Sequence, residues 1–491
     1  MKGHALQKFQ EISALLNSSL NQSEIRNRAI EAATVLMEAE AGSLLLLDEP
    51  TGELYFEVAL GEKGEEVREI RLKPGEGIAG HVAQTGVPVI VNDVQKDPRF
   101  SRVADNKSGF VTRNMVCVPV KARTKMLGAL QAINRRDGGL FTEEDLQTFV
   151  SLGHQVGIAI ENANLYEEIN RLFEGFISAS VLAIESRDPT TSGHSERVAA
   201  LTCGLAQVVD RVDRGPYADV QFNDDQMKEI RYAAVLHDFG KVGVREHVLV
   251  KAKKLFPGDL DLLRARFDFI KRTLEVQTLR GKVEILASHD QAAAAALLSQ
   301  LDEDLSRRMK EVDGILEFLL KCNQPSVLPQ EGFKRLQEIA KLSYESFDGS
   351  KPYLTTEEVK VLSIPEGSLT LEERREIESH VTHTYQFLSR IPWTRTLKNV
   401  PSIAYGHHEK LDGSGYPRQI SSEMISVQTR MMTICDIYDA LTASDRPYKV
   451  AVPSTKALEI IEEKARDGQV DAHLFELFVG AKVYKRVQRA S

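Results

Sequence analysis

The feature that most constrains this sequence is a change in hydrophobic periodicity about a third of the way along the chain. Up to residue 157, short apolar runs typical of buried strands alternate with helical stretches. From residue 184 onward the apolar spacing is almost wholly helical. We therefore expect an α+β multidomain protein, with an α/β domain over residues 1–157 and an all-α domain over residues 184–491.

Residues 158–183, between these two parts, carry an apolar repeat of seven residues. Its two positions are filled by Ile158, Leu165, Leu172 and Ala179 and by Ile169 and Phe176. Asn162 is the polar exception at the second position. Such a repeat is typical of a two-stranded coiled coil. It predicts a helical linker that pairs in parallel in a homodimer; one long helix packed on its own domain is the alternative.

Composition places the chain among globular proteins and excludes several other classes. Of its 491 residues, 42% are hydrophobic and 27% are charged, close to the globular average. No apolar stretch is long enough to cross a bilayer, and the N-terminal segment lacks the apolar core of a secretion signal. The four cysteines have neither metal nor disulfide spacing. We expect a cytoplasmic protein without a membrane partner, and the net charge of −9 argues against binding to nucleic-acid strands.

The α/β domain is predicted to begin with a helix and to continue as a sheet. Residues 6–36 have helical apolar spacing. Strands are predicted over residues 42–48, 53–59, 114–120 and 126–134. A closing helix is predicted from residue 142 past residue 161.

Several segments of this domain resemble a GAF sensor domain. They are the run Gly-Glu-Gly-Ile-Ala-Gly-His over residues 75–81, residues 86–93, and Asn134-Arg135 followed by Phe141 and Asp145. The resemblance implies a small-molecule ligand, although Arg135 stands where GAF domains that bind cyclic nucleotides carry Lys. A domain that only dimerises and transmits strain is the alternative.

Histidines are concentrated in the helical part of the chain. Of the 12 histidines, eight lie between residues 194 and 408. His237 and Asp238 are adjacent at the end of an apolar helical stretch, and a carboxylate can bridge two metal ions because it has two oxygens. A His-Asp pair alone is weak evidence, and we interpret the pair His289-Asp290 as structural.

Three further motifs accompany His237-Asp238. They are His194 at the start of a helix, His407-His408 before the loop Asp412-Gly-Ser-Gly-Tyr-Pro417, and Asp436 in Asp436-Ile-Tyr-Asp439. Together these motifs resemble the HD-GYP phosphodiesterases of the HD superfamily, over residues 180–275 and 370–450. The resemblance implies an all-helical bundle around a bi- or trinuclear metal site.

The same resemblance implies roles for individual residues. One metal ion would be held by His194, His237, Asp238 and Asp436, and a second by Asp238, His380, His407 and His408. Lys241 would contact phosphate and take part in catalysis with Asp238. Substrate would be bound by Asp412, Gly413, Gly415, Tyr416, Pro417 and Arg446. His383, one helical turn after His380, is a competing ligand.

Three departures from the family bear on the metals and on access to them. Thr190 stands where members with three metals carry Glu, so we predict two divalent ions. Mixed histidine and carboxylate ligands suit Fe, Mn or Zn rather than Ca or Mg, and we expect Fe or Mn. The loop after the His-Asp motif reads Lys251-Ala-Lys-Lys in place of Lys-Pro-Gly, and residues 276–369 form an insert that we expect to be a helical hairpin or small bundle.

These residues predict a GAF-regulated phosphodiesterase that hydrolyses a cyclic dinucleotide, namely cyclic di-GMP, to pGpG and/or GMP. Two metal ions suit this reaction because they generate hydroxide near neutral pH and hold both sides of the scissile phosphodiester. A catalytically weak or inactive signalling protein that binds cyclic dinucleotide or partner proteins is one alternative. A 3′,3′-cyclic GMP-AMP hydrolase is another.

Overall fold

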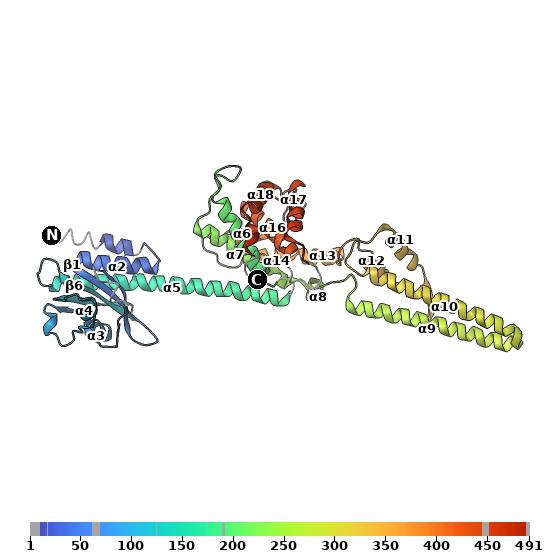
Figure 1. The fold of residues 1–491 in the computed structure, drawn as a ribbon, viewed down its shortest axis with the longest axis horizontal. Coiled ribbons are helices and arrows are strands. Elements are labelled where there is room, and N and C mark those ends of the chain that lie inside the picture. The colour runs from blue at the N-terminus through green and yellow to red at the C-terminus, as the bar shows by residue number, and fades with distance from the viewer. Residues whose placement is uncertain are drawn as a thin grey trace. The chain divides into compact units, whose positions relative to one another are not determined.

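The computed structural model describes residues 10–16, 18–60, 69–123, 125–188, 192–443 and 451–487. The chain forms two units, Met1–Gly175 and Phe176–Ser491, which meet within one long helix, α5 (Glu143–Arg187) (Figure 1). The predicted linker over residues 158–183 is a continuous part of this helix. The predicted α+β class is confirmed, since the first unit contains the large sheet and the second is mostly helical.

The first unit is built on a six-stranded antiparallel sheet with the strand order β3-β2-β1-β6-β5-β4. Its strands are β1 (Ala39–Leu47), β2 (Leu54–Leu60), β3 (Arg71–Leu72), β4 (Val89–Val91), β5 (Met115–Ala122) and β6 (Lys125–Arg135). The four predicted strands are confirmed as β1, β2, β5 and β6. Leu130 of β6 lies opposite both Leu44 and Val118, so it is fully buried at the centre of the sheet.

Helices cover both faces of this sheet. They are α2 (Gln22–Leu36) and α5 on one face, and α3 (Gly77–Thr85) and α4 (Val103–Ser108) on the other. Ile30 of α2 and Phe149 of α5 are fully buried in the first layer, and Val82 of α3 in the second. The helix predicted over residues 6–36 is interrupted before α2, because the Asn21 side chain accepts a hydrogen bond from the Glu24 N–H and begins a new helix there.

The GAF-like residues at the end of β6, Asn134 and Arg135, make contacts that hold this part of the fold together. The Asn134 side chain accepts a hydrogen bond from the Arg113 N–H at 2.7 Å and donates one to the Val111 carbonyl at 2.9 Å. Arg135 forms an ion pair with Asp145 of α5 at 2.7 Å. The pattern therefore fastens the end of β6 to the start of α5, and arginine in place of lysine still makes that ion pair.

The second unit is a helical bundle with an extension. The bundle helices are α6 (His194–Val209), α7 (Asp224–Leu236), α8 (Glu246–Leu249), α13 (Leu371–Glu378), α14 (His380–Leu388), α15 (Val400–Tyr405), α16 (Val427–Thr442), α17 (Ser454–Arg466) and α18 (Ala472–Gly480), with short 3-10 helices η4 (Phe239–Gly243), η5 (Ser422–Met424) and η6 (Val483–Arg486). α6, α7 and α16 each carry several of the buried apolar residues of the bundle. α6 packs against both α7 and α16, so its first residue lies at the bundle centre.

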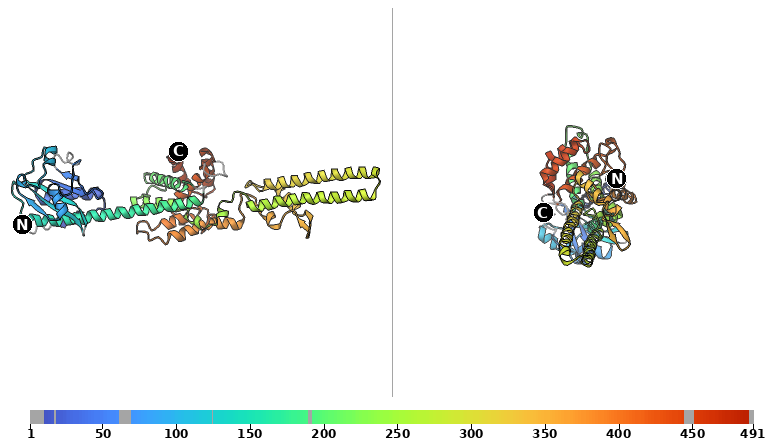
Figure 2. Two further views of the ribbon diagram at one scale, coloured as in Figure 1. Left: turned by 90° about the horizontal axis from the view of Figure 1, so that it is seen from below. Right: turned by 90° about the vertical axis from the view of Figure 1, so that its right-hand side faces the viewer.

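The extension has a hydrophobic core of its own. It consists of α9 (Pro257–Ser288), α10 (Gln291–Cys322), α11 (Gln330–Ile339), the hairpin of β7 (Ser343–Ser346) and β8 (Gly349–Pro352), and α12 (Thr356–Leu362). α9 and α10 lie side by side along their length (Figures 1 and 2). The insert start expected near residue 276 lies inside α9 and is corrected to Pro257, because Phe267 and Leu274 already belong to this separate core.

The root of the extension is tied by one buried lysine. Lys254 is fully buried, and its ammonium donates to the carbonyls of Leu362 and Ile364 at the end of α12. Its backbone N–H donates to the Asn323 carbonyl just after α10. The four cysteines are free, and none of the helices in the described residues is both long and apolar enough to cross a membrane.

Candidate metal centre

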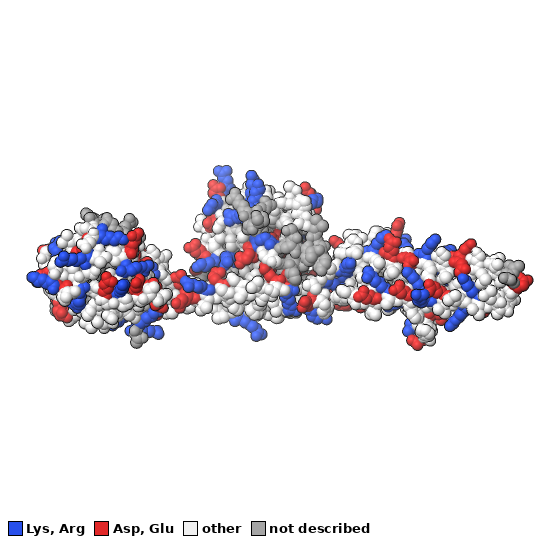
Figure 3. Space-filling view, turned by 60° about the horizontal axis from the view of Figure 1, so that its bottom comes forward, with Lys and Arg blue, Asp and Glu red and all other residues white. Residues whose placement is uncertain are grey.

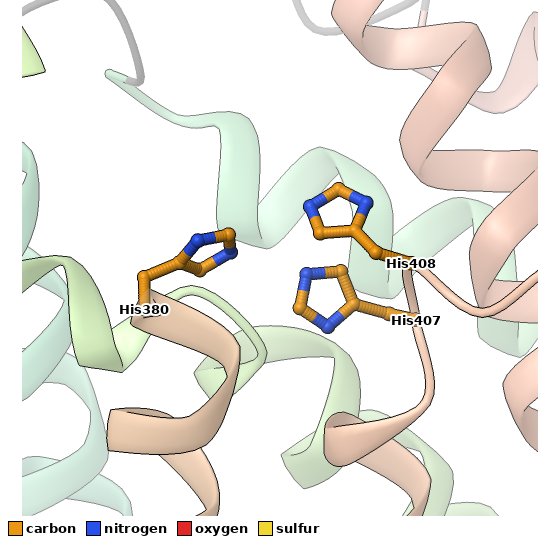
Figure 4. Close-up of side chains that lie close together, drawn as sticks. All are labelled: His380, His407 and His408. Atoms are coloured by element: carbon orange, nitrogen blue, oxygen red, sulfur yellow. The ribbon is translucent and has the colours of Figure 1, made fainter. Parts of the chain in front are cut away.

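Five segments of the second unit bring the predicted metal ligands together. They supply His194 as the first residue of α6, His237 and Asp238 directly after α7, His380 as the first residue of α14, His407 and His408 after α15, and Asp436 within α16. Among the residues that the structure describes, three groups have donor atoms within 4.8 Å of one another: His380, His407 and His408; His194, His237 and Asp238; and His237, His407 and Asp436. Figure 4 shows the rings of the first group gathered about one point.

Asp238 lies between the two sides of this cluster. Its Oδ1 is 3.2 Å from Nε2 of His380, whereas its Oδ2 is 3.7 Å from Nε2 of His194 and 3.6 Å from Nε2 of His237. Asp436 Oδ1 lies 3.3 Å from His194 Nε2, and Asp436 also forms a donor group with His237 and His407. Because its two oxygens face different histidines, Asp238 has the geometry of a carboxylate that bridges two ions.

Three histidines are fixed in one tautomer by the helical turn before them. The Nδ1 atoms of His237, His380 and His407 lie 2.7, 2.6 and 2.7 Å from the carbonyl oxygens of Ala234, Ile377 and Ala404. A carbonyl only accepts hydrogen bonds, so each Nδ1 donates and each Nε2 keeps its lone pair. Within the described residues these three Nε2 atoms are buried and make no hydrogen bond.

The unpaired Nε2 atoms of His237, His380 and His407 indicate whether the site suits a metal ion. Buried lone pairs that face carboxylate oxygens are costly unless a cation lies between them. Neutral imidazole and carboxylate are also the donor types that transition metals such as Fe and Mn accept. The residues therefore fit the predicted divalent ions.

Burial and neighbouring charges favour the ligating protonation states of four residues, namely His407, His408, Asp238 and Asp436. Burial lowers the pKa of His408 to about 4, and burial together with His408 lowers the pKa of His407. Burial raises the pKa of Asp238 and Asp436, but Lys241 beside Asp238 and the hydrogen bond of His194 to Asp436 outweigh it, so both pKa values fall. Neutral histidines and ionised aspartates are the forms that bind metals.

Lys241 is held beside the bridging carboxylate. Its Nζ lies 2.9 Å from Asp238 Oδ2 and 3.3 Å from Asp188 Oδ2. Burial lowers the pKa of Lys241, but the two aspartates outweigh burial and raise it, so the amine stays protonated. A fixed ammonium group at this position can face an anionic ligand that reaches the cluster.

Close packing of η4 on α14 positions His380. A side chain at Gly240 would collide with the backbone carbonyl of His380 and the N–H of Thr384, so only glycine allows this approach. The Thr384 hydroxyl accepts from the Gly240 N–H at 2.8 Å and donates to the His237 carbonyl at 2.9 Å. The two segments that carry His237 and His380 are therefore locked together.

The competing ligand His383 lies elsewhere. Its ring packs against Gly243, where it fills the space that a side chain would occupy. It belongs to none of the donor groups found among the described residues. The geometry therefore favours His380 over His383 as the ligand.

The loop after His408 is held against the cluster. Tyr416 donates its N–H to the His408 carbonyl at 3.2 Å, and the two rings lie 4.7 Å apart between centroids. A side chain at Gly415 would overlap the backbone of residues 408–410. Asp412 is turned onto Ser414, accepting from its N–H at 2.9 Å and its hydroxyl at 2.7 Å, so it shapes the turn at Gly413 before Tyr416-Pro417.

Of the remaining residues singled out in the sequence, Lys251 is described by the structure, whereas Thr190 and Arg446 are not. Lys251 is almost fully buried and forms an ion pair with Glu373 at 2.7 Å, which anchors α13. Thr190, on which the prediction of two ions rests, and Arg446, a predicted substrate residue, lie outside the described residues.

Three residues that support the cluster were not assigned a role from the sequence. Asp439 accepts from His194 Nδ1 at 2.7 Å, Arg197 holds Asp439 at 2.7 and 3.0 Å, and Asp188 contacts Lys241. Asp439 lies one helical turn after Asp436, and that spacing was the available signal, because residues three apart share a helix face. Arg197 and Asp188 give no comparable signal, since surface charges at such positions are common.

Family comparisons agree with this arrangement. Residues 19–161 match the GAF domain family, and residues 356–474 match the HD domain family. The HD match covers His380, His407, His408 and Asp436, while His194 and His237-Asp238 precede it.

Curated relatives match parts of the chain. A Vibrio cholerae protein described as 3′3′-cGAMP-specific phosphodiesterase 3 is 45% identical over 97 residues, which are 20% of this chain and 20% of that protein. A Caenorhabditis elegans protein described as probable 3′,5′-cyclic phosphodiesterase pde-5 is 31% identical over 169 residues, 32% of this chain and 23% of that protein. This chain thus spans less than a quarter of each of these two relatives.

Solved structures match over the first unit's length. A GAF domain from a Coxiella burnetii phosphoenolpyruvate-protein phosphotransferase is 22% identical, covers 33% of this chain and 96% of its own, and gives a TM-score of 0.31. The family matches, together with the sheet of the first unit and the helical bundle of the second, identify the chain as a GAF domain followed by an HD domain.

Proposed function

We propose that this protein is a metal-dependent phosphodiesterase that hydrolyses cyclic di-GMP to pGpG and/or GMP in the cytoplasm, under control of its GAF domain. The observation that carries the proposal is Asp238, whose two oxygens face histidines on opposite sides of one buried cluster. Paired sites of this kind are typical of phosphodiester hydrolysis.

The chain would hold two divalent ions, Fe or Mn, with two ligand sets that share Asp238. His194, His237 and Asp436 complete the first set, and His380, His407 and His408 the second. When bound, two such ions supply a hydroxide near neutral pH and neutralise charge on a phosphate.

The chain's own groups would orient the substrate. Lys241 presents a protonated amine beside Asp238 and would bind a non-bridging phosphate oxygen. Burial raises the pKa of Tyr416, which keeps its phenol neutral next to His408, where it can pack against a nucleobase. Gly413, Gly415 and Pro417 shape this loop, and we propose Asp412 and Arg446 as further substrate-binding residues.

A second candidate substrate is 3′,3′-cyclic GMP-AMP. The Vibrio cholerae relative, which is 45% identical over 97 residues, is described as specific for that dinucleotide. Both substrates present the same phosphodiester groups to the metal ions and differ in one base, so comparison of their hydrolysis rates decides between them.

Control by the GAF domain would pass through α5. This helix begins on the GAF sheet and ends directly before Asp188, which contacts Lys241. We propose that a small molecule bound by the GAF domain acts along α5, and that α5 pairs with its copy in a homodimer.

The test is turnover of cyclic di-GMP and of 3′,3′-cyclic GMP-AMP by the full chain after loading with Mn or Fe and measurement of the bound metal. Linear dinucleotide or mononucleotide product supports the proposal, and the faster substrate is assigned. Absence of product from both dinucleotides in metal-loaded protein contradicts it; tight binding without hydrolysis would then indicate the signalling role. His237→Ala should abolish turnover, whereas His289→Ala, in the exposed pair His289-Asp290, should leave it unchanged.

A further inference from the structure

Helix α9 has two apolar faces. One is covered by α10, and among the described residues the other is partly covered only at Phe269, whose ring lies beside Tyr344 and Phe347 of the β7–β8 hairpin. Leu263, Phe267, Ile270 and Leu274 are buried against α10, which contributes Val312 and Leu319. α10 has no counterpart of the second face, since none of its large apolar side chains in the described residues is strongly exposed.

The second face is a stripe with the spacing of a coiled coil. The exposed side chains are Leu262, Phe269, Val276, Leu279, Val283 and Leu286. Leu262, Phe269, Val276 and Val283 follow one another at intervals of seven, and Leu279 and Leu286 fall at the second heptad position. In the distal half, 45% of Val276, 59% of Leu279, 66% of Val283 and 62% of Leu286 is exposed. We call these six residues the outer stripe.

We propose that the outer stripe binds the outer stripe of a second copy of this chain, with the two α9 helices antiparallel. The stripe runs over 25 residues, 262–286, and the register given next pairs residues 269–286, about 26 Å of helix, which is long enough for several layers of apolar contacts. We propose the antiparallel register in which Val276 faces the partner's Leu279 and Phe269 faces the partner's Leu286.

The charges beside the outer stripe favour this register. Glu275 then faces the partner's Lys282, and symmetry repeats the pair on the other side. Asp268 faces the partner's His289, which adds a contact that is favourable when the histidine is protonated. Within the chain, Glu275 also contacts Arg272 at 2.6 Å and Lys282 contacts Asp302 at 2.5 Å, so both flanking side chains are already oriented at the helix surface.

A parallel pairing of the same stripe is less favourable. Arg272 occupies a second heptad position and would face the partner's Arg272 between apolar layers. In the antiparallel register Arg272 lies opposite the partner's Val283, so like charges do not meet. Phe347, which is 97% exposed at the β7–β8 turn, lies beside Phe269 with ring centroids 6.2 Å apart, and antiparallel pairing places the two hairpins at opposite ends.

The surface of the extension also fits a partner like itself. Acidic and basic side chains are interspersed over it on the face shown in Figure 3. A mixed surface matches another mixed surface, whereas nucleic acid or an anionic membrane would call for a basic patch.

The experiment is sedimentation velocity of the full chain over a concentration series, with and without Leu172→Glu, which disrupts any pairing through α5. Leu279→Glu with Val283→Glu should weaken self-association by more than about tenfold, because charges enter an apolar contact. The two residues are more than half exposed, so the fold should persist. Gln277→Glu, on the same helix but outside the stripe, is the matched control.

Charge exchange tests the orientation. Glu275→Lys and Lys282→Glu should each weaken association, and the double variant should restore it, because the two positions then face each other with their charges exchanged. In a parallel pair the double variant would not restore it, since position 275 would face the partner's Arg280. Unchanged association after Leu279→Glu with Val283→Glu, or a double charge variant that stays as weak as the single ones, overturns the proposal.

Discussion

His194 Nδ1 lies 2.7 Å from Asp439 Oδ2, and both residues are almost fully buried at the centre of the HD bundle. Arg197 holds the same carboxylate with Nε at 2.7 Å and Nη2 at 3.0 Å. The carboxylate fixes the proton on Nδ1 and aims Nε2 at Asp238 and Asp436. Burial lowers the pKa of His194, but hydrogen bonds with Asp436 and Asp439 outweigh it and raise the pKa to about 9, so a bound cation would replace the Nε2 proton.

Replacing Asp439 with Asn should weaken metal binding without unfolding the bundle. An amide can no longer fix the charged carboxylate contact to His194, and loss of such a supporting carboxylate typically costs about 10- to 100-fold in metal affinity. Competition with a metal-binding dye measures the affinity. Arg197→Lys, which keeps a cation beside Asp439, should lose less. Wild-type affinity in Asp439→Asn would show that Asp439 does not orient His194.

His380→Ala and His383→Ala should separate the two competing ligands. His380 Nε2 faces Asp238, whereas His383 packs against Gly243. We expect His380→Ala to lose about one equivalent of metal per chain by elemental analysis, because the second ligand set loses one of its four donors, the one nearest Asp238 Oδ1. His383→Ala should keep both equivalents and lose only stability. The reverse pattern would assign His383 as the ligand.

The sequence identifies the predicted metal ligands better than the residues that hold those ligands in place. Predicted ligands such as His407 and His408 lie in short motifs that are visible in the chain. Asp439 was within a quoted motif, yet its role depends on α6 packing against α16, which brings His194 to it. The Arg197 contact depends on the same packing and has no local signal.

The sequence predicted that the insert is helical, but it predicted neither the residue at which the insert starts nor the β7–β8 hairpin. The expected helical hairpin is present as α9 and α10, and α10 buries Val312 and Leu319 against α9. The start of the insert was predicted too far along the chain, because the helical apolar spacing around Phe267 resembles that of the preceding bundle helices. Pro257, at the first position of α9, is a helix-start signal. The β7–β8 hairpin went unpredicted, although Asp348-Gly349 is a turn signal, because its strands are only four residues each.

The metal-free protein should lose stability as the pH falls from about 6.5 toward 4. Burial lowers the pKa of His408 to about 4, below its ordinary value of 6.5. Between these values the unfolded chain binds a proton that the folded chain does not, so stability rises with pH and is lost on acidification, by up to about 3 kcal/mol for this group. Thermal unfolding of chelated protein at several pH values measures the slope. His408→Gln should reduce it, and the exposed His289→Gln should not; equal slopes in all three proteins would contradict the assignment.

Gly240→Ala should destabilise the HD bundle. The added methyl group would collide with the His380 carbonyl and the Thr384 N–H, so η4 and α14 must separate. Overpacking of this kind costs about 1–3 kcal/mol. Denaturant unfolding measures the change. Gly314→Ala in α10 is the control, because the new methyl group meets nothing within 4 Å and should stabilise by about 0.5–1 kcal/mol. A neutral Gly240→Ala would mean that the two segments are not held as closely as the structure has them.

Leu172→Glu should abolish pairing through α5. The apolar repeat on this helix is exposed, with 44% of Ile158, 47% of Leu165 and 75% of Leu172 accessible, so a charge there leaves the single chain intact but opposes a parallel partner. We expect the dimer to dissociate in sedimentation experiments that start from chains already carrying Leu279→Glu, in which pairing through α9 is removed. Arg171→Glu is the matched control, since Arg171 is exposed on the same helix and lies outside the repeat. A dimer that survives Leu172→Glu in this background would show that the contact between chains lies outside α5. Any signal from the GAF domain would then pass along one unpaired α5 helix.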